Sequence, residues 1–208
     1  MTSQVRRTRN RRGEGARLRD EIVEAASALL EETGSEDAVT LRGVARRLGI
    51  AAPSIYPHFD DVDAILAAVV AEAFAELDAA LDAVPVSAGA EVSLRSLCEA
   101  YVGFARARPQ RYRVMFGRHR VDADAAMSAP RSVEELLGGS AFGRLLDAVN
   151  RQSSGPEGRA IVDATALWVS LHGYVSLRAA VPAFPWPEGD GLVDHLVARL
   201  APPQGDAP

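Results

Sequence analysis

Residues 40–59 (TLRGVARRLGIAAPSIYPHF) combine arginine with hydroxyl, aromatic and imidazole side chains. The guanidinium group of Arg42 can meet a phosphate through paired donors. The hydroxyls of Ser54 and Tyr56 can contact base edges or phosphate oxygens, and Pro53 can pack against a thymine methyl. Residue types of this kind, close together in one segment, are typical of contact with nucleic acid.

Two short helices joined by a glycine turn are expected to position these side chains. Thr40 is a good N-cap for the first helix, whose apolar residues fall on one side before Gly49 turns the chain. A second short helix is expected from Pro53 to about Phe59, because a helix can begin with proline at little cost. A capped helix, a glycine turn and a short second helix fit a helix-turn-helix.

The second short helix must end close to Pro57, because this residue lacks a backbone donor and its ring pushes on the preceding turn. Ile55 and Phe59 are four residues apart, so both should face the core. The polar and aromatic residues among them are then directed outward or to the flank. In that position His58 is better suited to bind phosphate than a base.

Charge is distributed unevenly along the chain. All 23 basic residues are arginines, and the net charge is -5. Residues 1–19 carry a charge of +6, which leaves -11 for the remainder. This basic arm neutralises phosphate or enters the minor groove, or else it is a disordered solubilising tail. Arg46 and Arg47, off the apolar face of the first short helix, either contact phosphate or are solvated.

Length and composition suit one or two globular domains, with 208 residues, 48% of them apolar and 25% charged. Apolar residues recur at helical spacing in nearly every segment, whereas sustained alternation is absent, so the expected fold class is all-α. Besides the two short helices, helices are expected at about 16–33, 60–84, 94–105, 109–116, 133–149, 159–181 and 192–200.

The helix expected at about 159–181 is apolar on two sides. Such a helix lies between the domain core and another surface, either a partner subunit or a ligand cavity. The candidate ligand-binding residues are Tyr101, Phe104, Met115, Phe116, Trp168 and His172. Each of them is either a pocket residue or an ordinary core residue, and the histidine could also belong to a dimer seam.

The segment 39-VTLRGVARRLGIAAPSIYPHFDDVDAIL-66 resembles the DNA-binding region of the TetR family of bacterial repressors. The residues that stand at the family's capping, turn, recognition and core positions are Thr40, Arg42, Ala45, Gly49, Pro53, Ser54, Tyr56, His58 and Phe59. The resemblance implies about nine helices, a homodimer, and a separate C-terminal domain that binds an inducing small molecule. The DNA contacts that it favours are Thr40, Arg42, Pro53, Ser54, Tyr56 and His58.

The later part of the chain looks like one TetR subgroup, whose C-terminal domain is named for a Trp-His-Gly signature. The segments that carry this likeness are 101-YVGFARARPQRYRVMFG-117 and 167-LWVSLHGYVSLRAA-180, with the three signature residues spread over Trp168, His172 and Gly173. The domains expected are a disordered Arg-rich arm (1–15), a helix-turn-helix domain (16–62), a ligand-binding and dimerisation domain (63–201) and a disordered tail (202–208).

Other classes of function find little support in the sequence. The four histidines lack zinc spacing, and neither a Gly-rich phosphate loop nor a nucleophile elbow is present, so we expect no enzyme, no metal and no cofactor. The most lipid-like window, 161–181, contains Asp163, His172 and Arg178, which favours a buried helix over a membrane span. No apolar stretch follows the basic arm, so a cytoplasmic location is expected.

These inferences together predict a ligand-responsive repressor, which binds a palindromic double-stranded DNA operator as a homodimer and is released by a small apolar or amphipathic molecule. One departure from the family supports an alternative. The family often has a lysine at the start of the long helix, whereas this chain has Asp60, Asp61 and Asp63, which repel DNA. The alternative is a helical interaction protein of the same fold that has lost specific DNA binding.

Overall fold

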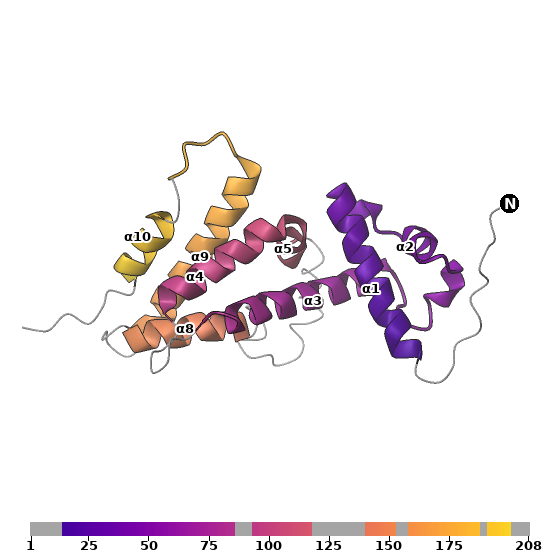
Figure 1. Cartoon of the computed structure of the whole chain (residues 1–208), viewed down its shortest axis with the longest axis horizontal. Helices are drawn as coiled ribbons and strands as arrows, with labels where there is room; N and C mark the ends of the chain where they lie inside the picture. Colours follow the sequence, from indigo (N-terminus) through magenta and orange to yellow (C-terminus); the bar gives the residue numbers. More distant parts are fainter. Residues whose placement is uncertain (1–13, 86–92, 118–139, 153–157, 188–190, 201–208) are drawn as a thin grey trace, which may run out of the picture. The chain divides into compact units, whose positions relative to one another are not determined.

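The computed structural model describes residues 14–85, 93–117, 140–152, 158–187 and 191–200. Within these ranges the chain forms eight α-helices and two short 3-10 helices, and no strand (Figure 1). The all-α class predicted from the sequence is therefore confirmed. The first part of the helix expected over 133–149 lies outside the described residues.

The chain divides into two compact units, residues 1–70 and residues 71–208. The first unit holds the α-helices α1 (Glu14–Thr33) and α2 (Leu41–Leu48), the 3-10 helices η1 (Glu36–Ala38) and η2 (Ala52–Ser54), and the start of α3 (Val62–Asp82). Its core side chains include Ile22, Ala26, Leu30, Val44, Ile55, Phe59 and Leu66. The domain limits expected from the sequence, 16–62 and 63–201, remain a prediction.

Helix α2 begins and ends with the caps that the sequence predicts. The side chain of Thr40 accepts a hydrogen bond from the backbone N–H of Gly43 at 3.0 Å, which satisfies one of the free donors of the first turn. Gly49 ends the helix in the left-handed region, at φ 67°, where residues with a Cβ are strained.

The short helix expected from Pro53 to Phe59 is wrong in its length and type. The structure has a 3-10 helix, η2, followed by a hydrogen-bonded turn in which the N–H groups of His58 and Phe59 both donate to the carbonyl of Ile55, at 2.8 and 3.1 Å. Pro57 has no N–H to donate and its ring pushes on the preceding turn, so a continuous α-helical ladder cannot form across this segment. The orientation of its apolar residues is nevertheless as expected, because Ile55 and Phe59 are both buried.

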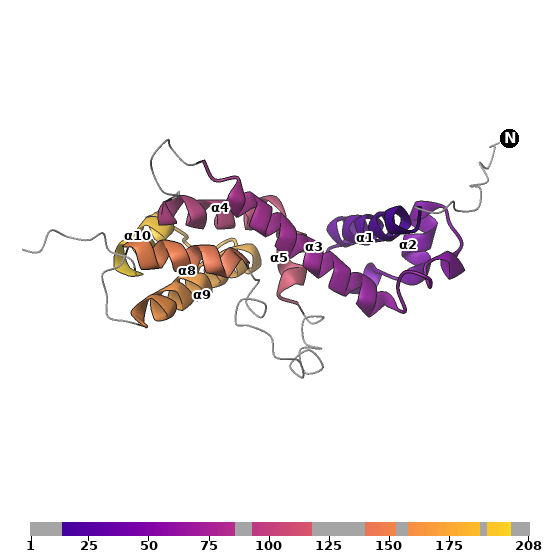
Figure 2. The ribbon, with the colours of Figure 1, turned by 90° about the horizontal axis from the view of Figure 1, so that it is seen from below.

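The second unit is a helical bundle built around one apolar core. It contains the rest of α3 and the helices α4 (Leu94–Ala107), α5 (Pro109–Met115), α8 (Ser140–Gln152), α9 (Arg159–Ala180) and α10 (Gly191–Leu200). Helix α9 packs against α8, α4 and α10, as Figures 1 and 2 show. The core residues include Leu77, Leu81, Leu97, Tyr101, Phe142, Leu145, Leu167, Trp168 and Leu171.

Arginine side chains join α3 to its neighbours within the second unit. Arg144 on α8 donates two hydrogen bonds to Asp82 Oδ1, at 2.6 and 2.9 Å, and a longer one of 3.3 Å to Asp78. Arg111 on α5 pairs with Glu76 on α3. Single surface ion pairs contribute little, but shared and multidentate pairs fix the register of one helix against another.

Gly49→Ala should lower the free energy of unfolding by about 1 kcal/mol, because alanine at φ 67° is strained. Gly103→Ala is the matched control. Gly103 lies inside α4 with open space around a Cβ, so alanine there should raise stability by about 0.5 to 1 kcal/mol. Urea unfolding followed by circular dichroism measures both changes. Equal shifts of the same sign would contradict the assignment of Gly49 as a left-handed cap.

Candidate functional site

The six residues predicted to contact DNA all lie in the first unit, on α2 and the segment that follows it. Thr40, Arg42, Pro53 and Tyr56 are exposed, and Ser54 and His58 are half-buried. Tyr56 is 55% exposed, which is unusual for an aromatic residue in a small helical unit. None of the six is buried, so each has a surface from which a contact could be made.

Thr40 can cap α2 and donate a hydrogen bond at the same time. Its Oγ1 accepts from Gly43, which uses one of the two acceptor positions of the hydroxyl. The hydroxyl proton remains available for an acceptor such as a phosphate oxygen. The backbone N–H groups of the first turn of α2 add further donors and a partial positive charge at the same end.

The three arginines of α2 have different surroundings. Arg47 donates two parallel hydrogen bonds to the carboxylate of Glu32 on α1, each of 2.9 Å. These bonds hold the pKa of Glu32 below its usual value. Arg42 and Arg46 are exposed and have no ion-pair or hydrogen-bond partner in the described part of the chain. Arg47 is thus committed to the protein itself, and the other two are free to bind an external anion.

Two contacts fix the end of the turn that carries Tyr56. Arg19 of α1 lies over the ring of the buried Phe59, with its guanidinium carbon 4.9 Å from the ring centroid, within the range of cation–π attraction. Beyond the turn, Asp61 Oδ1 accepts a hydrogen bond of 2.8 Å from the N–H of Ala64 and caps α3. Asp61 therefore stabilises the start of α3, whatever its effect on DNA.

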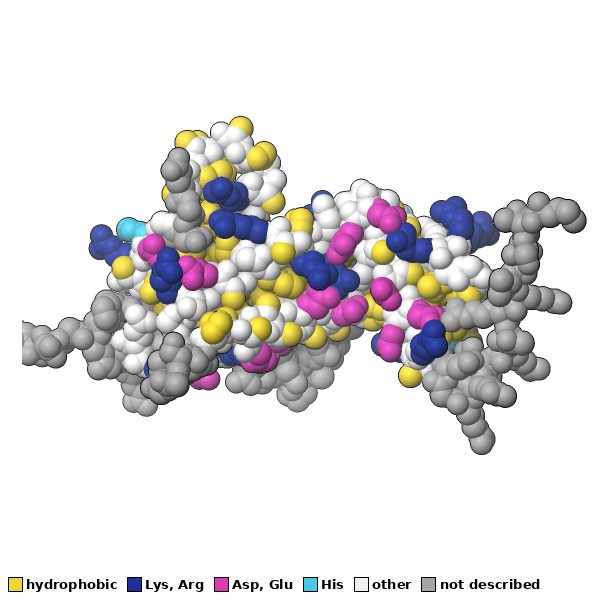
Figure 3. All heavy atoms as spheres, viewed as in Figure 1, with side chains coloured by type: hydrophobic (Ala, Val, Ile, Leu, Met, Phe, Trp, Pro, Cys, Tyr) yellow, Lys and Arg dark blue, Asp and Glu magenta, His cyan; other side chains and the backbone are white. Residues whose placement is uncertain are grey.

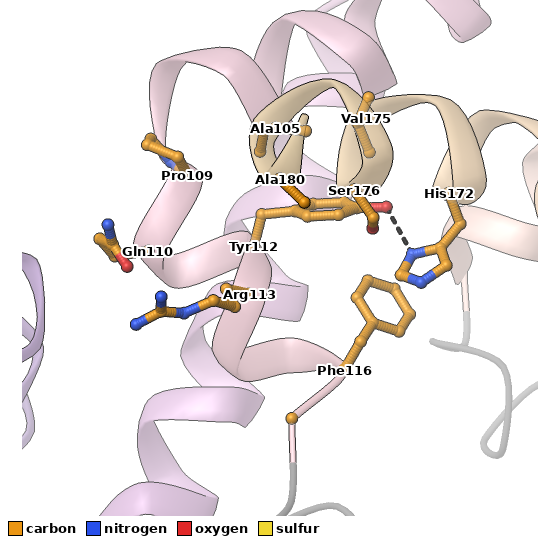
Figure 4. A pocket seen from close by; sticks show the side chains of 12 residues that line it. Ala105, Pro109, Gln110, Tyr112, Arg113, Phe116, His172, Val175, Ser176 and Ala180 are labelled. Carbon is orange, nitrogen blue, oxygen red and sulfur yellow. Dashed lines mark hydrogen bonds between the residues drawn. The ribbon is translucent and has the colours of Figure 1, made fainter. Parts of the chain in front are cut away.

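A cavity of about 550 Å³ lies in the second unit between α5 and α9 (Figure 4). Its described lining residues are Ala105, Pro109, Gln110, Tyr112, Arg113, Phe116, Gly117, His172, Val175, Ser176, Ala179 and Ala180. Two of the six ligand-binding candidates, Phe116 and His172, are among them. The other four belong to the core beside the cavity, since Tyr101, Phe104, Met115 and Trp168 are all buried. Ligand contact by any of the six remains a prediction.

Sequence reasoning found His172 but missed the other polar residues that line the cavity. Gln110 and Arg113 are three residues apart on α5 and therefore share a face of that helix. On α9, the lining residues His172, Val175, Ser176 and Ala179 follow helical spacing. Periodicity could have predicted this α9 stripe in full. The part played by α5 could not be predicted, because it depends on how a seven-residue helix packs.

A chain of buried hydrogen bonds connects the core to the cavity. The hydroxyls of Tyr101 and Tyr112 lie 2.7 Å apart, and the Tyr112 hydroxyl is 2.8 Å from Nδ1 of His172. Burial raises the pKa of both tyrosines well above the usual range, so both keep their protons. Each hydroxyl therefore has one proton to donate.

The number of protons decides which group donates in each of these two hydrogen bonds. Tyr101 is fully buried, and its hydroxyl has one neighbour among the described residues, the hydroxyl of Tyr112. If Tyr112 donated to Tyr101, the proton of Tyr101 would lack an acceptor, which costs about 1 to 3 kcal/mol. Tyr101 therefore donates to Tyr112, and Tyr112 donates to Nδ1 of His172. The imidazole proton of the neutral ring is then on Nε2.

One face of α9 carries exposed apolar residues. Val162, Val169 and Leu177 recur at about two-turn intervals and are 65%, 61% and 56% exposed. Figure 3 shows further apolar side chains at the surface where α9 ends and the next segment begins. By length and composition alone α9 could cross a membrane, but one such helix is weak evidence for a membrane span, and 39% of its most apolar window is buried. An apolar stripe of this kind is typical of a protein interface.

Comparison with protein families shows to which family this chain belongs. Residues 22–69 match the family of bacterial regulatory proteins called tetR, and residues 94–200 match the tetracyclin repressor-like C-terminal domain. The second match alone covers more than half of the chain. The protein belongs to the TetR family. Its first match contains α2 and the turn with Tyr56, and its second contains the cavity between α5 and α9.

Solved structures share the TetR fold with this chain. Regulatory protein SCO4313 is 22% identical with a TM-score of 0.68, and the match covers 94% of this chain and all of that one. The TetR family transcriptional regulator PfmR from Thermus thermophilus is 18% identical (TM-score 0.56; coverage 91% and 98%). A TetR variant from Acinetobacter baumannii in complex with minocycline is 22% identical (TM-score 0.52; coverage 86% and 90%). A search of curated proteins found no match.

The Trp-His-Gly signature of the TetR subgroup falls on three different environments of α9. Trp168 is buried, with its ring 5.2 Å from that of Tyr101. His172 lines the cavity, whereas a Cβ added at Gly173 would meet nothing within 4 Å in the described chain. Close packing within the described chain therefore gives no reason for this glycine. Membership of the subgroup remains a prediction.

In this TetR protein, His172 should be the tautomer that carries its proton on Nε2, because Nδ1 accepts from Tyr112. Two-bond ¹H–¹⁵N NMR spectra at neutral pH, with the signals assigned through His172→Gln, report which nitrogen is protonated. Tyr112→Phe is the control, because it removes the donor and should allow both tautomers. A proton found on Nδ1 in the unaltered protein would contradict the direction of the chain.

Proposed function

We propose that this protein is a ligand-responsive transcriptional repressor. It binds a palindromic DNA operator as a homodimer and leaves it when a small apolar or amphipathic molecule occupies the cavity of the C-terminal unit. The observation that carries the proposal is the pairing, in one TetR chain, of an exposed helix-turn-helix surface with a separate cavity. It acts as a cytoplasmic regulator and catalyses no reaction.

The proposed DNA contacts are Thr40, Arg42, Pro53, Ser54, Tyr56 and His58. Their exposure supports the proposal, as does the spare proton of the Thr40 hydroxyl. Phosphate contacts from Arg42 and Thr40 would fix the position of the helix-turn-helix on the duplex, while the exposed ring of Tyr56 would reach into the major groove. Few base-reading donors are available, so phosphate contacts supply much of the affinity.

The proposed ligand site is the cavity between α5 and α9. Mixed apolar and polar lining is usual for a small-molecule site, and a volume of about 550 Å³ is in the range of such sites. The related TetR variant whose structure contains minocycline supports a ligand in this fold. We also propose that the chain belongs to the subgroup with the Trp-His-Gly signature, whose histidine lies at this cavity as His172.

A ligand can release DNA only if it binds the DNA-free state more tightly. To change a 99:1 population to 1:99 it must prefer that state by about 5.5 kcal/mol.

The alternative, a helical interaction protein without specific DNA binding, is favoured by one observation. Asp60, Asp61 and Asp63 follow the recognition turn directly, and Asp60 and Asp61 are exposed. These carboxylates would repel DNA phosphates near the start of α3.

Binding to DNA from the neighbourhood of the protein's own gene distinguishes a repressor from a helical interaction protein. Binding is measured by fluorescence anisotropy at several salt concentrations, with random DNA of the same length as competitor. A repressor should select a near-palindrome with half-sites about 34 to 36 Å apart or a multiple, and affinity should fall steeply as salt rises. If no local intergenic DNA competes better than random DNA, the repressor proposal fails.

Arg42→Ala should weaken operator binding about tenfold and reduce the salt dependence by about two counter-ions, one for each subunit of the dimer. Arg47→Ala is the matched control. It removes the same charge from the same helix, but Arg47 is held by Glu32, so the loss of affinity should be smaller. Fluorescence anisotropy over a salt series measures both variants. Equal losses would show that general charge, rather than a contact by Arg42, carries the effect.

The homodimer is proposed to form through the exposed apolar face of α9. Val169→Arg should dissociate the dimer and abolish operator binding, because it places a charge within a buried interface. Ala79→Arg, at a position of α3 that is not buried, is the control and should leave the dimer intact. Analytical ultracentrifugation gives the mass of each variant. A dimeric Val169→Arg protein would place the interface elsewhere.

A further inference from the structure

One serine of α9 has a hydroxyl that the helix itself does not use. Thr165 and Ser170 donate their hydroxyl protons to the backbone carbonyls four residues earlier, those of Ile161 and Ala166, at 2.7 Å in each case. Such a carbonyl is a common partner for a hydroxyl within a helix. Ser176 makes no bond of this kind, and its hydroxyl has no hydrogen-bond partner in the described part of the chain. It is therefore available to another molecule.

Ser176 lies where a molecule in the cavity can reach it. The residue is half-buried and belongs to the lining of the cavity between α5 and α9 (Figure 4). Its Oγ atom is accessible, unlike Ser27 Oγ and Gln110 Oε1, which are buried without a partner in the described residues. The hydroxyl of Ser176 is therefore open to a hydrogen bond with an occupant of the cavity.

Aromatic rings lie about one turn of α9 away from Ser176. His172 precedes Ser176 by four residues, so the two side chains are neighbours on the same face of α9. The ring centroids of His172 and Phe116 are 4.2 Å apart, and those of Tyr112 and Phe116 are 5.1 Å apart. Phe116 and His172 are half-buried and line the cavity, so part of this ring cluster is accessible from it. This part of the lining thus combines an aromatic surface with one available hydroxyl.

An aromatic ligand gains more from this ring cluster than a saturated molecule of the same size. Aromatic pairs that meet edge to face or offset are favourable beyond the area that they bury, because the edge of one ring is attracted to the face of another. Saturated carbon buries a similar area but lacks this attraction. The side chains of Ala105, Ala179 and Ala180 are small, and the cavity volume of about 550 Å³ is sufficient for a molecule with more than one ring.

We propose that the cavity binds an aromatic molecule whose ring packs against Phe116 and His172 and whose polar substituent forms a hydrogen bond with the hydroxyl of Ser176. The inference rests on the ligand-responsive function proposed above, and it names the chemical class of the ligand and a residue that determines specificity. A serine hydroxyl can donate or accept, so a phenol, an aromatic amide and an aromatic ketone each fit this position.

Two bicyclic probes test the hydrogen bond on the full-length protein by isothermal titration calorimetry at neutral pH. They are 2-naphthol and naphthalene, which lacks the hydroxyl. Ser176→Ala should weaken binding of 2-naphthol about fivefold and leave that of naphthalene unchanged, because only 2-naphthol loses a hydrogen bond. Ser170→Ala is the matched control, since the hydroxyl of Ser170 is used by α9 and the residue is not in the described lining, so neither affinity should change. If 2-naphthol does not bind the unaltered protein, or binds both serine variants equally, the inference is overturned.

A third probe, decahydro-2-naphthol, tests the aromatic contact, because it keeps the hydroxyl and has no aromatic ring. Phe116→Leu keeps an apolar side chain and removes the ring, so it should weaken binding of 2-naphthol about fivefold and that of decahydro-2-naphthol less than twofold. Thermal unfolding followed by circular dichroism shows that the variant is folded. Equal losses for the two alcohols would mean that buried area alone selects the ligand, and would overturn the assignment of an aromatic ligand.

The inference and the proposed function fail in different ways. Calorimetry needs no DNA, and Ser176→Ala is also tested on operator DNA without a probe, where its affinity should not change. If 2-naphthol binds through Ser176 but no operator is found, the repressor proposal fails and the inference stands. If an operator is bound but Ser176→Ala leaves 2-naphthol binding unchanged, the inference fails and the repressor proposal stands.

Discussion

Burial of α9 is the constraint on which the second unit depends. This 22-residue helix packs against three others, and Leu167 and Leu171 are fully buried in the shared core. Removal of such side chains from water is the main favourable term in folding. Because one face is used in this way, the other faces are left for function. His172 lies on the side that lines the cavity, and Val169 and Leu177 lie on the side that is exposed. The same helix thus connects core, cavity and proposed dimer surface.

The buried hydrogen-bond chain depends on that packing. Tyr101 and Tyr112 come from α4 and α5, and their rings meet edge to face at 5.8 Å while their hydroxyls meet at 2.7 Å. Two polar groups can lie in an apolar core only when every proton has an acceptor. His172 provides the last acceptor, so its ring orientation follows from residues in the core rather than from the cavity. His172 is therefore held at the cavity wall by the protein itself.

The sequence predicts contacts that repeat along one helix, and it fails where contacts join distant segments. Helical spacing places Leu66, Val69, Ala73, Leu77 and Leu81 on one face of α3, and all five residues are buried. The caps at Thr40 and Gly49 were equally predictable, because capping is local chemistry. The ion pair between Arg47 and Glu32 joins residues 15 positions apart, so only the packing of α2 on α1 reveals it. The place of Gln110 among the cavity residues likewise depends on how α5 packs, which no local pattern describes.

One missing backbone donor accounts for the form of the recognition segment. Pro57 prevents a continuous α-helix, and the chain forms η2 and a turn instead. A short turn of this kind would be unstable alone, but Ile55 and Phe59 anchor it in the core and Arg19 covers the ring of Phe59. The exposed Tyr56 is therefore presented from a rigid base at small entropic cost. For the proposed DNA contact, this rigidity offsets the scarcity of base-reading donors, since a pre-positioned ring loses little freedom on binding.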